Sequence, residues 1–146
     1  MKRALKKLIS PIQKARLYVR VGLKGITFLK AFRMIRYWVL TNVFRKKIPW
    51  LIEFSLTYRC QCRCPHCSVG VYLDSASKKD ELNNEEIKSV LAQAARLGIP
   101  KVDFFGGEPL IKEGILDLVK FGAKNGFYMS ITTNAWLLTR ELTKEL

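Results

Sequence analysis

The sequence predicts an α/β fold in which helices cover a parallel sheet. Between residues 51 and 146, short runs of apolar residues alternate with longer segments whose apolar residues recur at helical spacing. Glycine, proline and asparagine separate these segments, as expected for turns. A helix between two consecutive strands makes the strands parallel, so the alternation predicts a parallel sheet with about three strand–helix units.

The charge pattern divides the chain into two parts. Residues 1–50 contain 14 Lys and Arg and no acidic residue, whereas residues 51–146 contain 12 basic and 12 acidic residues. With 146 residues, of which 49% are hydrophobic, the chain is long enough to form one domain with a core. We therefore predict a basic, amphipathic helical arm over residues 1–48 and an α/β domain over residues 49–146.

The arm is predicted to be helical in pieces, interrupted at Pro11 and at Gly22 and Gly25. From Ile26 onward, aromatic and aliphatic residues alternate with basic ones, which is typical of a helix that lies on an anionic membrane surface. Packing of the apolar stripe on the α/β domain is the main alternative, and contact with nucleic acid is less favoured. Signal-peptide features and an apolar run of the ~18 residues that span a bilayer are both lacking, so we expect a cytoplasmic protein that associates with the inner membrane surface or remains soluble.

The elements of the domain follow in order. Residues 51–56 are predicted to form a buried strand, and Asn83 to cap a helix whose first turn contains Glu85 and Glu86. Gly98 ends this helix and Pro100 prevents its continuation. Further strands are expected over residues 101–105 and 127–132, with a helix over residues 111–124 between them. Thr139 is expected to cap a third helix.

All four cysteines and the only histidine lie within the eight residues from Cys60 to Cys67. These cysteines are too close together to form two unstrained disulfides, which indicates a reduced, metal-binding use. Thiolates are soft ligands suited to iron–sulfur clusters, zinc or Cu(I). The cysteine segment follows the first predicted strand, Gly106–Pro109 follows the second, and Thr132–Asn134 ends the third. Since ligand sites of such folds lie at the carboxyl ends of parallel strands, these segments are expected to form one site.

Two motifs resemble those of the radical S-adenosylmethionine (radical SAM) superfamily over residues 51–146. Cys60, Cys64 and Cys67 have the C-x3-C-x2-C spacing of its cluster-binding signature, and Gly106-Gly107-Glu108-Pro109 matches its GGEP motif. The resemblance implies that the three cysteines bind three irons of a [4Fe–4S] cluster, which leaves the fourth iron open for S-adenosylmethionine. It also implies S-adenosylmethionine contacts from the GGEP motif, His66, Thr133 and Asn134, and assigns no further catalytic residue.

By this resemblance the protein is an enzyme that cleaves S-adenosylmethionine reductively to a 5′-deoxyadenosyl radical, which abstracts hydrogen from a substrate not identified by the sequence. An electron donor such as flavodoxin or ferredoxin is implied. The family fold resembles a six-unit partial (β/α) barrel, of which about three units are expected here, so the chain is predicted to be truncated. Cys62 is expected to point away from the cluster. The alternative is a zinc-binding module with a basic arm that binds nucleic acid or membrane.

Overall fold

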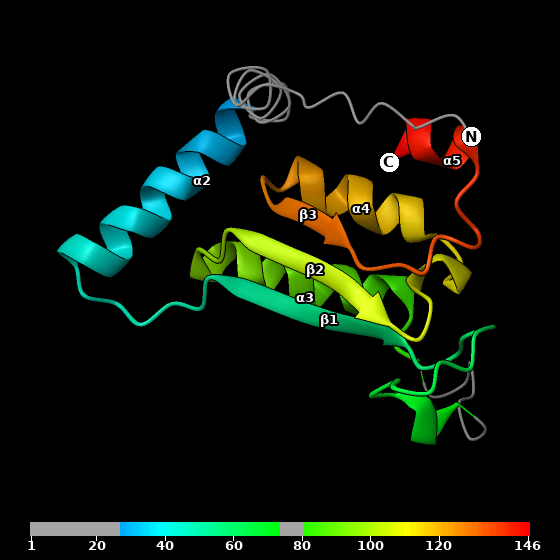
Figure 1. Cartoon of the computed structure of the whole chain (residues 1–146). Coiled ribbons are helices and arrows are strands. Elements are labelled where there is room, and N and C mark those ends of the chain that lie inside the picture. Colours follow the sequence, from blue (N-terminus) through cyan, green and yellow to red (C-terminus); the bar gives the residue numbers. More distant parts are fainter. Residues whose placement is uncertain (1–26, 74–80) are drawn as a thin grey trace, which may run out of the picture.

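The computed structural model of the chain describes residues 27–73 and 81–146 (Figure 1). Within them, three strands form one sheet in the order β1-β2-β3, with β1 at Leu51–Thr57, β2 at Lys101–Gly106 and β3 at Tyr128–Ile131. Both strand pairs are parallel, which confirms the predicted α/β fold. Phe54 pairs with Phe104 and Phe104 with Ile131, so the apolar side chains of the three strands share one face.

Helices α3 (Asn84–Leu97) and α4 (Ile115–Lys124) lie on one side of the sheet (Figure 1). The core between them and the sheet consists of apolar side chains with at most 6% exposure: Leu56, Ile87, Leu91, Ala94, Ile99, Val102, Phe104, Ile115, Leu118 and Phe127. Asn83 caps α3 through a complete capping box with Glu86, and Gly98 ends the helix in the left-handed conformation. Both ends of this helix are as predicted.

The second predicted helix begins later than the sequence pattern indicated. Pro109–Ile111 forms a short 3-10 helix (η4), and α4 begins only at Ile115 rather than at Ile111. Lys112 has an extended backbone and Gly114 a left-handed one with φ of 75°, so helical geometry cannot pass through this segment. Strand β3 is also shorter than the predicted 127–132, whereas Thr139 caps α5 (Arg140–Glu145) as expected.

Of the basic arm, the structure describes residues 27–48, and the predicted interruptions at Pro11, Gly22 and Gly25 lie outside the described residues. Thr27 caps α2 (Phe28–Trp38), which continues into a π-helical turn, η1 (Val39–Val43). The predicted amphipathic helix is therefore present. Within residues 27–73 and 81–146, no helix is long and apolar enough to cross a membrane. The division of the chain near residue 49 stays a prediction.

Candidate functional site

Three loops meet at the carboxyl edge of the sheet, as the sequence predicted (Figure 1). Residues 58–73, here called the cysteine loop, follow β1. They contain the four cysteines and the short 3-10 helix η2 (Gly70–Tyr72). The GGEP turn follows β2, and the segment 132–134 follows β3. Hydrogen bonds between these loops join them into one unit.

The cysteine loop contains four free cysteines. Cys60, Cys62 and Cys67 are partly buried, and Cys64 is exposed. The Cys62 amide donates to Cys60 Sγ over 3.4 Å, and the Cys67 amide donates to the Cys64 carbonyl over 3.1 Å. Partial burial raises the pKa of the Cys62 thiol, and the neighbouring Cys60 and Cys64 raise it further. The thiolate form, which binds metal, is therefore disfavoured at Cys62. Its expected position outside the cluster stays a prediction.

The GGEP turn is hydrogen-bonded to the root of the cysteine loop. The Gly107 amide donates to the Thr57 carbonyl over 2.7 Å, and the Glu108 amide donates to the Arg59 carbonyl over 2.9 Å. A Cβ added at Gly106 would lie 2.2 Å from the Thr57 oxygen, and one at Gly107 would lie 2.3 Å from the Arg59 oxygen. Only glycine therefore allows the GGEP turn to approach the backbone at the start of the cysteine loop so closely. The sequence did not reveal that these two segments are neighbours.

Glu108 connects the GGEP turn to the segment after β3. Its side chain is completely buried, and Oε1 accepts hydrogen bonds from the Leu110 amide (2.9 Å) and the Thr133 hydroxyl (2.8 Å). Oε2 accepts one from the Asn134 amide over 2.9 Å. The adjacent Pro109 is also buried. Glu108 therefore fixes Thr133 and Asn134 in place, and its contact with the amino group of S-adenosylmethionine stays a prediction.

Asn134 reaches from the β3 end to the cysteine loop. Its Nδ2 lies 3.4 Å from Cys62 Sγ and 3.7 Å from Cys60 Sγ, within hydrogen-bonding reach of both. Its Oδ1 accepts from the Gln61 side chain over 3.3 Å and from the Trp136 amide over 2.9 Å. Asn134 thus both closes its own turn and contacts the sulfur atoms. His66 is exposed on the cysteine loop, and its predicted contact with the adenine is a prediction still.

A buried ionic network that sequence reasoning missed supports the cysteine loop. Glu81 accepts hydrogen bonds from the Thr57 hydroxyl (2.5 Å), Arg59 Nε (2.7 Å) and Lys112 Nζ (3.2 Å). Burial raises the pKa of Glu81, but the hydrogen bonds from Arg59, Thr57 and Lys112 outweigh burial and lower it to about 2. These residues are 22 to 31 positions from Glu81 in the chain, so no local pattern relates them.

The donor set fits an iron–sulfur cluster. The thiols are free, they are soft ligands, and a backbone amide and an amide side chain already donate to Cys60 Sγ, as is common around cluster sulfurs. Among the residues that the structure describes, no three Cys, His, Asp or Glu side chains are arranged to hold a single metal ion. In a four-iron cluster each thiolate binds a different iron, so the sulfurs need not converge on one point.

Comparison with known proteins gives matches of two kinds, in sequence and in structure. PqqA peptide cyclase of Bradyrhizobium diazoefficiens is 41% identical over 99 residues, which are 68% of this chain and 26% of that protein. PqqA peptide cyclase of Rhodopseudomonas palustris is 38% identical over 94 residues, 64% of this chain and 24% of that protein. The chain thus spans about a quarter of the length of these curated relatives.

Two solved structures of Streptococcus suis SuiB share the fold. SuiB bound to precursor peptide SuiA has a TM-score of 0.59 at 20% identity, covering 100% of this chain and 28% of that chain. SuiB bound to S-adenosylmethionine has a TM-score of 0.55 at 18% identity, and the match covers 95% of this chain and 33% of that chain. The family model described as the Radical SAM superfamily matches residues 54–146, which include all three loops of the site. The chain therefore belongs to the radical SAM superfamily, whose cofactors are a [4Fe–4S] cluster and S-adenosylmethionine.

Proposed function

We propose that the protein is a radical SAM enzyme that modifies a peptide. The observation that carries the proposal is the hydrogen-bonded junction at the carboxyl edge of the sheet. There the cysteine loop, the GGEP turn and the segment after β3 are joined through Gly107, Glu108 and Asn134. When bound, the cluster and S-adenosylmethionine supply reductive cleavage of the sulfonium and hydrogen abstraction from the substrate.

The residues of this chain hold and orient these cofactors. Cys60, Cys64 and Cys67 would bind three irons, and the Asn134 side chain would donate a hydrogen bond to the Cys60 sulfur. S-adenosylmethionine would contact the GGEP backbone, His66 and Thr133. Glu108 keeps the GGEP turn and Thr133 in register through its two buried carboxylate oxygens.

The relatives support a peptide as the substrate class. The relatives at 38% and 41% identity are PqqA peptide cyclases, and SuiB has been crystallised with precursor peptide SuiA. On the sheet face opposite α3 and α4, polar side chains lie in register across the strands, with Glu53 opposite Asp103 and Asp103 opposite Ser130. We propose that this polar face is directed toward the substrate.

The remaining partners are also proposals. The enzyme would take its electron from flavodoxin or ferredoxin, and it would work in the cytoplasm at the inner membrane surface. The acid-free composition of residues 1–50 supports the membrane placement. Nucleic acid is not proposed as a partner.

Reconstitution of the chain with iron and sulfide under anaerobic conditions tests the function. After reduction with dithionite, the protein should convert S-adenosylmethionine to methionine and 5′-deoxyadenosine, measured by liquid chromatography and mass spectrometry. Cys64→Ala should abolish both cluster binding and cleavage, while Cys62→Ala, a change in the same loop, should retain them. Stoichiometric zinc in aerobically purified protein, together with no spectral response to S-adenosylmethionine after reconstitution, would instead favour a zinc-binding module.

A further inference from the structure

Helix α2 exposes its apolar stripe and directs its cations inward. Phe28, Phe32 and Ile35 follow at i, i+4 and i+7 on one face, and they are 87%, 54% and 62% exposed. The neighbouring stripe, which contains Arg33 and Arg36, faces the domain. Leu29 lies beside Gly126 and Leu40 beside Gly98, so the inward face contains apolar side chains as well as the two arginines.

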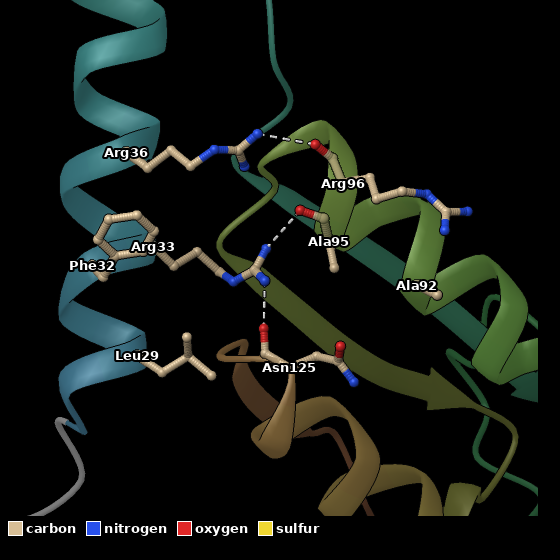
Figure 2. Close-up of a pocket in the computed structure, with 8 residues that line it drawn as sticks. All are labelled: Leu29, Phe32, Arg33, Arg36, Ala92, Ala95, Arg96 and Asn125. Atoms are coloured by element: carbon tan, nitrogen blue, oxygen red, sulfur yellow. Dashed lines mark hydrogen bonds between the residues drawn. The ribbon is translucent and has the colours of Figure 1, made fainter.

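The inward arginines bind the carboxyl ends of two helices, as Figure 2 shows. Arg36 donates to the Arg96 carbonyl over 3.1 Å. Arg33 donates to three backbone carbonyl oxygens, those of Ala95 (3.1 Å), Ile99 (3.3 Å) and Asn125. These carbonyls lie where α3 and α4 end, and the negative ends of the helix dipoles favour a cation there. The arginines thus fix the rotation of α2 about its axis, and this rotation leaves Phe28, Phe32 and Ile35 each more than half exposed.

An apolar groove adjoins the same stripe. It has a volume of about 590 Å³ and lies between α2 and the amino-terminal edge of the sheet. Its lining includes Met34, Ile35, Trp50 and Tyr128, and the lysines Lys30 and Lys101 also border it. The cysteine loop lies at the opposite edge of the sheet, so a partner that covers the groove would not obstruct the cofactor site (Figure 1).

We infer that α2 docks on an anionic lipid bilayer through Phe28, Phe32, Ile35 and the adjoining groove. The inference deepens the membrane placement in the proposed function and rests on it. A bilayer has an apolar interior beneath anionic headgroups. The apolar interior suits the exposed aromatic stripe, and the anionic headgroups suit the basic residues that precede and follow this stripe in the sequence. Residues 1–50 contain 14 cations and no acid, and Arg45, Lys46 and Lys47 are exposed directly after the helix. A second copy would bring two such segments together, so charge repulsion disfavours it.

Vesicle binding by the full chain tests this inference. The probes are vesicles of phosphatidylcholine alone and of phosphatidylcholine with about one third phosphatidylglycerol, and flotation gives the partition coefficient. Binding is expected only to the anionic vesicles and should weaken between 0.1 and 0.5 M KCl, because salt screens the headgroup charge. Ile35→Ser should lower the partition coefficient about tenfold. Leu97→Ser is the matched control, because Leu97 is 63% exposed on another helix, and it should change the coefficient less than about twofold.

Three results would overturn the inference. The first is an absence of binding to anionic vesicles. The second is an equal fall of the partition coefficient in Ile35→Ser and Leu97→Ser. The third is a protein that does not bind vesicles but forms a concentration-dependent dimer, which Ile35→Ser abolishes. Formation of 5′-deoxyadenosine is measured separately in detergent-free solution and should be equal in both variants. A failure of the cofactor chemistry is thus distinguishable from a failure of docking.

Discussion

Replacement of Gly107 by alanine should disrupt the junction between the GGEP turn and the cysteine loop. The new Cβ would lie 2.3 Å from the Arg59 oxygen and 2.7 Å from the Tyr58 oxygen, both of which are backbone atoms that a side-chain rotation cannot move. The turn must therefore retreat, which stretches the hydrogen bonds from the amides of Gly107 and Glu108. Two such bonds contribute about 0.5–1.5 kcal/mol each. Overpacking adds about 1–3 kcal/mol.

The expected loss is therefore about 2–6 kcal/mol of the free energy of unfolding, a large share of the roughly 5–15 kcal/mol of a small domain. Urea unfolding of the metal-free protein, followed by tryptophan fluorescence, measures it. Gly70→Ala is the control in the same loop, because the closest atom to its Cβ would be Cys67 Cβ at an ordinary 3.5 Å. It should be neutral within about 0.5 kcal/mol or slightly stabilising. If the two variants unfold at the same urea concentration, the proposed backbone contact is wrong.

Three further changes test other parts of the structure. Glu81→Gln should remove a pH-dependent part of the stability. The folded pKa of Glu81, about 2, lies below the ordinary 4.5, so the wild type should lose stability as the pH falls from about 4.5 toward 2. The variant should lose less, which a comparison of urea midpoints over that pH range measures. Arg33→Lys keeps the charge but lacks the planar fork that binds several carbonyls, so amide hydrogen exchange in α2 should be faster, whereas Lys46→Arg should leave it unchanged. Asn83→Ala removes the capping box of α3 and should lower stability by about 1 kcal/mol in thermal unfolding, and an unchanged midpoint would contradict the capping role.

Local patterns were sufficient to predict the order of the elements and several of their ends. The ends of α3 follow from residues at or next to the ends of the helix. Asn83 accepts hydrogen bonds from its first free amides, Glu86 accepts one from the Asn83 amide, and Gly98 adopts the left-handed conformation. The position of the candidate site follows from a similar local argument. Cysteines after one strand, a GGEP turn after the next and Thr133-Asn134 after the third must share an edge once the strands are parallel. The beginning of α4 was missed because apolar residues recur at helical spacing from Ile111 onward. The backbone at Lys112 and Gly114, which lie within this pattern, is nevertheless not helical.

The amino-acid sequence alone was enough to predict the parallel α/β fold and the amphipathic character of α2. It could not determine what Gly106, Gly107 and Glu108 touch, since their partners are the backbone of the cysteine loop and the segment after β3, which are distant along the chain. Nor could it show that Glu81 lies among Thr57, Arg59 and Lys112. The direction in which α2 presents its apolar stripe was likewise decided by tertiary structure. The helical periodicity places arginines and aromatic residues on different faces, but only the carbonyls at the ends of α3 and α4 determine which face turns inward.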